Sequence, residues 1–400
     1  MNRITSLAIL ALAVSCRDAR TPTPPTGTVG PATVRGDARP SELESYIVEL
    51  RRDAGSPRAF ATSHGVSPKF VYLRALNGFA AALSASAAAQ LANEPAVARV
   101  QRDQAWYAAT DSVQLKPPGN LDLTDQSKMR LDGTYAQWPS QGVGVGIYFL
   151  DSGVRTTHQD LGGRIGLGVD FIGDGHGIED CLGHGTQMAG IAAGTYYGVA
   201  KRATINVVRI IDCNGRIIQS NALAGIDWII ANAARPCVAN LSIEGPTDPI
   251  SEAAVESLVA AGCVVAGAAG NDHGDACNFT PGSSPNAITV GNYAHYSKGK
   301  GSDYIEVLSN VGPCGDLFAP GSLVFSDWFT TDSATFYMGN GTSQSTAHVS
   351  GAAALILSEH PTYTPAQVWT RMNTDATLGV LTNAPLGTAN KVLRTHNGTP

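Results

Sequence analysis

The fold depends most on one stretch, which reads NGTSQSTAHVSG at residues 340–351 and continues as the apolar run AAALIL at residues 352–357. The apolar run predicts a buried helix, and Gly341 allows a tight turn before it. Ser343 therefore lies where a loop becomes a helix, at the positive end of the helix dipole. The backbone N–H groups at that point have no partner within the helix and can stabilise a developing oxyanion. A simple N-cap explains this serine equally well.

Three other stretches also place a polar side chain at one end. Two are apolar and are followed by the polar residue, and the third is rich in small residues and begins with it. Residues 143–150, VGVGIYFL, predict a buried strand that ends at Asp151, and residues 263–269, CVVAGAA, predict a second strand that ends just before Asn271. His184, in the sequence GHGT, begins a predicted helix of small residues. Because open α/β sheets carry their active sites at the carboxyl ends of the strands, we expect Asp151 and Asn271 at one edge of a sheet.

The order Asp151, His184, Asn271 and Ser343, each in its own motif, resembles the subtilisin-like serine proteases. The resemblance is greatest to the branch that contains proteinase K and aqualysin. The order Asp, His, Ser along the chain is itself a known signature of the family. The resemblance extends from about Leu121 to the C-terminus, and four motifs in order make it specific. It implies a three-layer α/β fold with a mainly parallel sheet.

The resemblance implies a catalytic role for each of the four residues. Ser343 would be the nucleophile, and His184 would take its proton and return it to the leaving amine. Asp151 would hold the imidazole tautomer, and Asn271 would donate its amide to the oxyanion together with the Ser343 N–H. This chemistry requires no cofactor. Taken singly, Asp151 and Asn271 are also explained as turn residues. His348, inside the apolar run, is interpreted as a core histidine.

Length and composition set the broad class of the protein. The chain has 400 residues and an ordinary apolar fraction, which predicts one large domain and a smaller one. Its formal net charge is −6 and it contains no basic block, so there is no reason to expect nucleic-acid binding. After the first residues, no apolar run approaches the length that spans a membrane.

The N-terminal residues predict export from the cytoplasm. Residues 1–16 resemble a secretory signal peptide, with Arg3 before a short apolar core. Their end, LAVSC, resembles a bacterial lipobox in which Cys16 is lipidated, with ordinary signal cleavage nearby as the alternative. Residues 17–43, rich in proline and threonine, predict an extended tether. The protein is therefore expected outside the cytoplasm, either secreted or held at the cell envelope by a lipid on Cys16.

Residues 44–109 predict a small α+β unit. Strands are expected at 46–50, 76–83 and 97–100, and a helix at 82–93. Such a unit is marginally stable by itself. It resembles the inhibitory propeptide of these proteases, with LNGF at 76–79 and PAV at 95–97 as landmarks; an unrelated small domain is the alternative. The resemblance implies an intramolecular inhibitor that is removed by self-cleavage, expected near the bond between Ala108 and Ala109.

Residues 110–400 form the predicted catalytic domain, in which strands and helices alternate. Strands are expected at 205–211 and 237–243, and helices at 222–234 and 251–261. Alternating buried strands and helices predict a parallel sheet with right-handed crossovers.

The resemblance also implies where a peptide binds, namely as an added strand between the edges at 215–218 and 242–245. The residues assigned to substrate contact are Gly215, Arg216, Ile217, Ser242, Ile243, Glu244, Gly245, Ala268, Ala269 and Gly270. Glu244 stands where the family has a glycine. A carboxylate in the groove would favour cationic substrate side chains over acidic ones. The alternative is that Glu244 points into solvent and has no effect.

Other departures from the family pattern lie next to the catalytic residues. Gln187 replaces a second histidine, and Gln344, Ser345 and Ala347 replace the usual Met, Ala and Pro. Some relatives with such changes are poor or highly selective proteases. A catalytically weakened binding protein and an ester hydrolase are therefore rival functions, which the intact catalytic set and the two peptide-binding edges disfavour.

Cysteine content predicts disulfides in the catalytic domain. Of the seven cysteines, only Cys16 lies outside it, and the other six allow 15 pairings. The resemblance implies the pairs Cys181–Cys213 and Cys277–Cys314. Cys237 and Cys263 remain, at the starts of two strands predicted to be neighbours, where either a bond or two buried free thiols fits.

The resemblance also implies a structural calcium site. The carbonyl groups of Pro285 and Ala287 and the carboxylate of Asp316 match it, and calcium prefers such oxygen ligands. Together these features predict a secreted serine endopeptidase that is made as an inhibited precursor. Its partners are polypeptide substrates and its own propeptide.

Overall fold

The computed structural model describes residues 43–103, 112–127, 130–295, 303–337 and 339–395. They fall into two compact units, Met1–Arg102 and Asp103–Pro400, which are described separately. The predicted signal peptide with Cys16, nearly all of the tether and the predicted cleavage site at Ala108–Ala109 lie outside the described residues.

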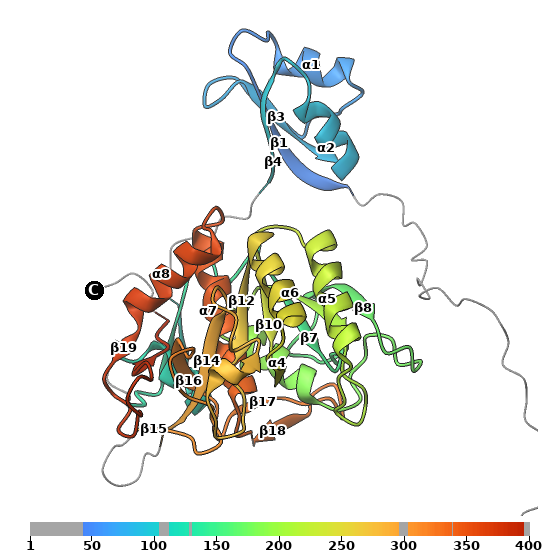
Figure 1. Cartoon of the computed structure of the whole chain (residues 1–400). Helices are drawn as coiled ribbons and strands as arrows, with labels where there is room; N and C mark the ends of the chain where they lie inside the picture. The colour runs from blue at the N-terminus through green and yellow to red at the C-terminus, as the bar shows by residue number, and fades with distance from the viewer. Residues whose placement is uncertain (1–42, 104–111, 128–129, 296–302, 338, 396–400) are drawn as a thin grey trace, which may run out of the picture. The chain divides into compact units, whose positions relative to one another are not determined.

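The N-terminal unit is an antiparallel sheet with two helices, as the α+β prediction required (Figure 1). The strand order is β2-β3-β1-β4. The elements are β1 (Glu44–Leu50), α1 (Pro57–Ser63), β2 (Phe70–Tyr72), β3 (Gly78–Leu83), α2 (Ala85–Ala92) and β4 (Val97–Arg102). The sequence did not predict α1 or β2. Helix α1 spans only seven residues, and its start is set by Ser56, whose Oγ accepts from the Ala59 N–H at 3.4 Å.

The C-terminal unit is built on a ten-stranded sheet with the order β19-β20-β16-β14-β12-β10-β7-β9-β8 and β15 beside β14. All pairs but β14–β15 and β19–β20 are parallel, which confirms the mainly parallel sheet. The strands are β7 (Gly146–Asp151), β8 (Ile165–Asp170), β9 (Thr204–Arg209), β10 (Cys237–Leu241), β12 (Cys263–Ala268), β14 (Ile288–Ala294), β15 (Tyr304–Ile305), β16 (Leu317–Pro320), β19 (Thr377–Leu378) and β20 (Lys391–Val392).

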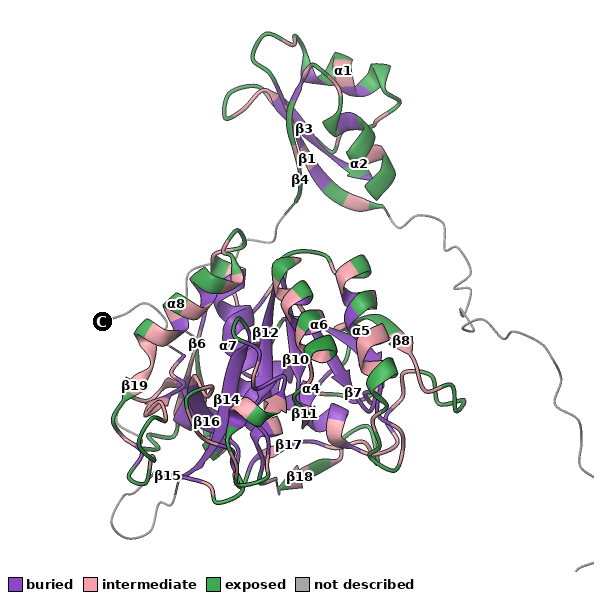
Figure 2. Ribbon diagram, viewed as in Figure 1, coloured by how far each residue is buried: buried purple, intermediate pink, exposed green. Residues whose placement is uncertain are grey.

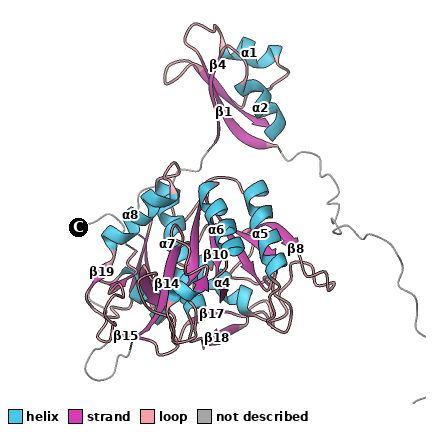
Figure 3. Cartoon of the chain, in the orientation of Figure 1, coloured by secondary structure: helices cyan, strands magenta, loops and turns pink. Residues whose placement is uncertain are grey.

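Helices cover both faces of this sheet and give the predicted three layers (Figure 3). One core joins α4 (His184–Ala193), α7 (Thr342–Glu359) and α8 (Pro365–Asp375), and the other joins α5 (Gln219–Asn232) and α6 (Pro249–Ala260). Successive side chains of β7 show why two cores form. Ile147 and Phe149 belong to the first, whereas Tyr148 and Leu150 belong to the second, since side chains alternate along a strand.

Shorter elements complete the unit and lie mostly at its edges. They are β5 (Ser112–Leu115), α3 (Gly119–Asp122), η1 (Leu123–Asp125), β6 (Thr134–Gln137), β11 (Gly245–Pro246), η2 (Ala276–Asn278), β13 (Phe279–Thr280), β17 (Phe325–Asp327) and β18 (Thr335–Tyr337). Among the described residues, no helix has both the length and the apolar character that a bilayer crossing demands.

Helix α7 runs through the core, and its residues from Gln344 to Leu357 are all buried (Figure 2). Gly351 shows how closely it packs, because a Cβ there would lie 2.6 Å from Val199 Cβ and 2.7 Å from the Ala192 carbonyl oxygen. The expected tight turn at Gly341 was wrong. Its φ of −168° is extended backbone that any residue adopts, and its small size instead leaves room for the Asn271 and Gln344 side chains.

Three disulfides join the six cysteines of this unit; the two pairs that the resemblance implied are confirmed, and Cys237 is bonded to Cys263. The Cα–Cα separations are 5.1 Å for Cys181–Cys213, 4.9 Å for Cys237–Cys263 and 5.2 Å for Cys277–Cys314. Cys237 and Cys263 are register partners at the first residues of β10 and β12. The alternative of two free thiols was therefore wrong.

Candidate active site

Asp151 and His184 form a hydrogen-bonded pair at the carboxyl end of the sheet. Asp151 is the last residue of β7 and His184 is the first of α4. His184 Nδ1 lies 2.8 Å from Asp151 Oδ1, so it donates to the carboxylate and leaves Nε2 as the basic nitrogen. Asp151 is 1 % exposed and the His184 side chain is 27 % exposed. Burial lowers the pKa of His184, but the Asp151 carboxylate outweighs it, and the net pKa is raised.

A second buried carboxylate, Asp180, organises the start of α4, and the sequence analysis missed it. Its Oδ1 accepts from the Gly183 N–H at 2.8 Å and from Ser152 Oγ at 2.9 Å. Its Oδ2 accepts from the N–H and the hydroxyl of Thr186 at 2.9 and 2.6 Å. An anion at a helix N-terminus is favourable, which was the available signal: an aspartate four residues before a helix-opening histidine.

Ser343 is the second residue of α7, after the N-cap Gly341, so the interpretation of Ser343 as the N-cap was wrong. Its hydroxyl donates to the Ser242 carbonyl oxygen at 3.3 Å. Among the hydrogen bonds of the described residues, none joins Ser343 Oγ to His184. Catalytic hydrogen bonds are often long in an enzyme without substrate and tighten when substrate binds.

Asn271 lies beside the start of α7 with its side-chain amide held in one orientation. Its Oδ1 accepts from the Thr342 N–H at 2.9 Å and from Thr342 Oγ1 at 3.2 Å. With Oδ1 bonded to Thr342, Nδ2 is the group of this amide that can donate, and the Asn271 side chain also hydrogen-bonds the Glu244 carboxylate. The loop also packs against Gly270, whose N–H donates to Thr342 Oγ1 at 3.3 Å. This orientation suits an amide donor to an oxyanion at Ser343.

Two of the departures from the family pattern contact one another. Gln344 Nε2 donates to Gln187 Oε1 at 3.0 Å, and both side chains are buried. Gln187 follows His184 by three residues on α4, and Gln344 follows Ser343 on α7, so the bond links the two catalytic helices. His348, by contrast, has no such role and is confirmed as a core residue. It is fully buried, donates to the Gln344 carbonyl oxygen and contacts Asn120, and burial lowers its pKa to about 4.

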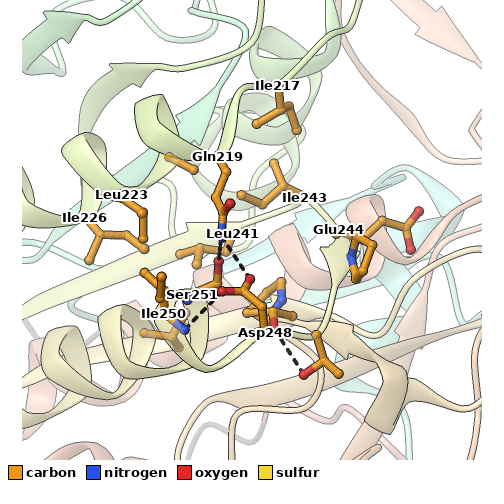
Figure 4. A pocket seen from close by; sticks show the side chains of 17 residues that line it. Ile217, Gln219, Leu223, Ile226, Leu241, Ile243, Glu244, Asp248, Ile250 and Ser251 are labelled. Atoms are coloured by element: carbon orange, nitrogen blue, oxygen red, sulfur yellow. Dashed lines mark hydrogen bonds between the residues drawn. The ribbon is translucent and has the colours of Figure 1, made fainter.

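The segments predicted to bind substrate border one apolar pocket of about 550 Å³ (Figure 4). Ile217 comes from one predicted edge, and Ile243, Glu244 and Gly245 come from the other. Helices α5 and α6 supply the far walls, with Leu223, Ile226, Ile250 and Val255. The first edge is not a strand, because a single bridge from Ile217 to Ile211 and bonds between Arg216 and Asp212 fold it into a turn around Gly215.

The remaining substrate-contact residues form the other side of the site. Ser242 Oγ donates to the Ser343 carbonyl oxygen at 2.9 Å, which ties this segment to the nucleophile. Ala268 ends β12, and Ala269 accepts at its carbonyl oxygen from Asn310 Nδ2 at 3.0 Å. The segment that carries Ser242 and the segment that carries Ala268 therefore flank Ser343.

Glu244 borders the apolar pocket, but its carboxylate neither points free into solvent nor enters the pocket. Its Oε2 accepts from the Asn271 N–H at 2.8 Å, and Figure 4 shows its carboxylate directed away from the other labelled side chains. The residue is exposed, yet surrounding protein atoms desolvate the carboxylate and raise its pKa, and Asp272 raises it further. Both interpretations of its orientation were therefore incomplete.

The predicted calcium ligands lie around one small cavity. Pro285, Ala287 and Asp316 all line a pocket of about 220 Å³, and Asp316 Oδ2 accepts from the Thr289 N–H at 2.9 Å. Burial raises the pKa of Asp316. Elsewhere in the described chain, Asp174 and His176 lie near Cys181 and Cys213, but those sulfur atoms form a disulfide and cannot act as thiolate ligands.

An Asp–His pair and a serine at a helix start, beside an amide donor, define the site of a serine hydrolase. Comparison with known proteins identifies the family within this class of serine hydrolases. The subtilase family model matches residues 140–395, and the peptidase inhibitor I9 model matches residues 45–109. The chain therefore belongs to the subtilase family and carries an inhibitor-type propeptide unit.

Individual relatives agree with this assignment. An extracellular serine proteinase of a Thermus species is 42% identical over 325 residues, which cover 81% of this chain and 77% of the relative. Alkaline serine exoprotease A of Vibrio alginolyticus is 35% identical over 334 residues, 82% of this chain and 60% of the relative. The crystal structure of a cold adapted subtilisin-like serine proteinase is 38% identical with a TM-score of 0.65, and covers 70% of this chain and 98% of the other. The chain is a serine endopeptidase of the subtilisin-like class.

Proposed function

We propose that this protein is an exported peptidase that hydrolyses internal peptide bonds with Ser343 as nucleophile, His184 as base and Asp151 as its partner. The observation that carries the proposal is the 2.8 Å bond from His184 Nδ1 to Asp151 Oδ1, together with Ser343 at the start of the buried helix α7. The bond fixes the tautomer in which Nε2 accepts the Ser343 proton. His184 then returns that proton to the leaving amine.

Asn271 and the backbone N–H of Ser343 stabilise the tetrahedral oxyanion. The bonds from Thr342 to Asn271 Oδ1 support this role, because they leave Nδ2 as the group that can donate. Removal of such a donor costs about 10²–10³ in turnover. Asn271→Ala is therefore expected to reduce kcat by that factor with little change in KM.

Peptide substrates extend from this centre along the segment 242–245, and an apolar side chain of the substrate enters the 550 Å³ pocket. The pocket supports this assignment because α5, α6 and β10 contribute aliphatic side chains to its walls. Substrates with a large aliphatic or aromatic residue at the corresponding position should be preferred, since its burial removes apolar surface from water.

The propeptide unit acts as an intramolecular inhibitor until self-cleavage near Ala108–Ala109. The match of the inhibitor I9 model to residues 45–109 supports this part of the proposal. Residues 1–16 then direct export, and Cys16 is the candidate lipid anchor of the precursor. Wild type should partition with membranes and Cys16→Ser should not; a soluble wild type whose N-terminus lies past Cys16 would refute the anchor.

Calcium would bind at Pro285, Ala287 and Asp316. The fit is one of donor chemistry, since two carbonyl oxygens and a carboxylate are the ligands that calcium prefers, and all three residues line one cavity. Bound there, calcium would stabilise the ends of β14 and β16 and would take no part in the chemistry. Addition of calcium should raise the unfolding temperature of wild type but not that of Asp316→Ala.

The decisive test of the proposed function is labelling with a fluorophosphonate, followed by mapping of the modified residue and a casein-cleavage assay. Modification of Ser343 with casein cleavage is the expected result. Modification elsewhere, or modification of Ser343 with turnover of esters alone, would overturn the proposal. His184→Ala, which removes the proposed base, is the matched control and should abolish both signals.

A further inference from the structure

The residue of the substrate that donates the reacting carbonyl must lie between two named segments. Strands β10 and β12 are paired in parallel up to Leu241 and Gly267, so residues 242–245 and 268–271 leave the sheet as neighbours. Ser343 Oγ is 3.3 Å from the Ser242 carbonyl oxygen, and Asn271 Oδ1 is 2.9 Å from the Thr342 nitrogen. A carbonyl group that is attacked by Ser343 and held by Asn271 therefore directs its own side chain into the space between these segments.

Glu244 crosses this space from one segment to the other. Its Oε2 accepts from the Asn271 N–H at 2.8 Å. Its carboxylate also rests against Gly270, because a Cβ on that residue would lie only 2.3 Å from Oε2. We call this contact the Glu244 bridge. A substrate side chain that enters here meets a carboxylate.

The local charge is negative. Asp272 follows the bridge and faces Glu244, and no salt bridge to either carboxylate occurs among the described residues. The polar groups that face the Glu244 carboxylate include the backbone N–H and the side chain of Asn271 and a second acidic residue, Asp272. A guanidinium or ammonium group would supply charged donors to both carboxylates.

We propose that the Glu244 bridge determines specificity at the residue that donates the scissile carbonyl, where it selects arginine or lysine over large neutral side chains. The inference rests on the proposed function. A cationic side chain replaces the Asn271 N–H as the partner of Glu244. A large apolar side chain must instead break the bridge and leave the carboxylate desolvated beside apolar atoms. An alanine side chain fits while the bridge stays intact.

The test uses peptides that differ only at this residue, with Arg, Ala, Phe or Glu. Values of kcat/KM are measured at low salt for wild type, Glu244→Gln and Glu244→Gly, each normalised by fluorophosphonate titration of active sites. Wild type should favour Arg over Phe by up to about fivefold, as partly exposed charge pairs allow. Salt should reduce the ratio because it screens exposed charge. Glu244→Gln should reduce it by removing the charge, and Glu244→Gly should reverse it by also opening the space.

Glu252→Gln is the matched control, since it removes the same charge from α6, where Glu252 Oε1 accepts from Thr247 Oγ1 at 2.7 Å. Its Arg-to-Phe ratio should equal that of wild type. Equal ratios in wild type, Glu244→Gln and Glu244→Gly would overturn the proposal, as would a wild type that prefers Phe. Failure of the proposed function would look different, because no variant would then cleave even the alanine peptide.

Discussion

The two sides of the catalytic centre differ in how they are held. Charged groups fix the His184 side, where Asp151 and Asp180 accept seven hydrogen bonds, two from Ser152 and five from residues 182–186. Neutral groups fix the Ser343 side, through the hydroxyl groups of Thr342 and Ser242 and the amide groups of Asn271 and Gln344.

This difference matches the charges that would develop in the proposed mechanism. An imidazolium would form at His184, where nearby carboxylates would stabilise it. An oxyanion would form at Ser343, where nearby carboxylates would oppose it. Glu244 is the exception, because its carboxylate accepts from the backbone N–H of Asn271, the proposed donor to the oxyanion. Substitutions on either side test this division.

Replacement of the nucleophile should have the largest effect. Ser343→Ala removes the reacting oxygen and should lower kcat by about 10⁶, as loss of the serine does in this class of site. The variant should also accumulate as the full precursor, which is read from its mass. A Ser343→Ala precursor that is still trimmed at Ala108–Ala109 in a protease-deficient host would show that another enzyme performs the cleavage.

Neutralisation of the His184 side should have the next largest effect. Asp151→Asn keeps the shape but favours the wrong tautomer, and should lower kcat by about 10⁴. Because the pKa of His184 is raised above 6.5 by Asp151, wild-type activity should rise with pH through a midpoint above that value. Without the Asp151 carboxylate, burial lowers the pKa of His184 and only the charge of Asp180 opposes it, so the midpoint should fall. If the midpoint of the pH–activity profile were the same in Asp151→Asn as in wild type, Asp151 would not be the group that raises the pKa of His184.

The stability that the His184–Asp151 pair contributes to the fold should change with pH in the opposite direction to the activity. It should fall as pH rises, whereas the activity should rise. A raised pKa in the folded state means that protonated His184 stabilises the fold below its ordinary pKa of 6.5, and that this contribution is lost as pH rises through the raised value. The stability difference between wild type and Asp151→Asn, measured by denaturant unfolding, should therefore be larger at acidic than at alkaline pH.

The disulfide on the His184 side should matter more for stability than for chemistry. Cys181–Cys213 closes a loop of separation 32 that contains the catalytic histidine. The double variant Cys181→Ser/Cys213→Ser should lose about 2–4 kcal/mol of unfolding free energy and keep near-normal kcat at low temperature. Cys277→Ser/Cys314→Ser is the matched pair on the other side. A selective fall in kcat in the first variant would show that the disulfide also positions His184.

Loss of the hydrogen bond between Gln344 and Gln187, which joins the two sides, should have the smallest effect on stability and activity. Gln344→Met or Gln187→Met each leaves a buried amide short of one hydrogen bond, which costs about 1–3 kcal/mol. The double Met variant replaces both partners and should be less destabilised than the sum of the single variants. Chemical denaturation and kcat of the four proteins form a double-mutant cycle, and strict additivity would mean that the two side chains act independently.

Local patterns in the sequence correctly predicted the strands, the helix and the core residue that depend on residues close together in the chain. The buried strands before Asp151 and Asn271, the helix behind Ser343 and the core position of His348 all follow from runs of apolar residues and small residues that the structure confirms. The three disulfide pairs were also right, two by resemblance and one from neighbouring strands.

Local patterns could not predict contacts between side chains that are far apart in the sequence. Gln187 and Gln344 lie 157 residues apart, and no local pattern indicates that two substitutions are partners. The hydrogen-bond partner of Glu244 could not be predicted because it is a backbone N–H, which every residue but proline carries and which no sequence motif reveals. Asp180 escaped notice because its role lies in five donors that only the folded loop assembles.

The burial of α7 has a practical consequence for anyone who follows this enzyme through heating or storage. Ser343, the proposed nucleophile, lies in the first turn of a helix that is buried from Gln344 to Leu357, with Gly351 in tight contact with Val199 and Ala192. Loosening of the interior therefore displaces Ser343 before the outer loops need change. Catalytic activity should therefore report on the packing of the core. Loss of activity on heating should coincide with loss of near-ultraviolet circular dichroism. A bulky residue at position 351 should lower both together.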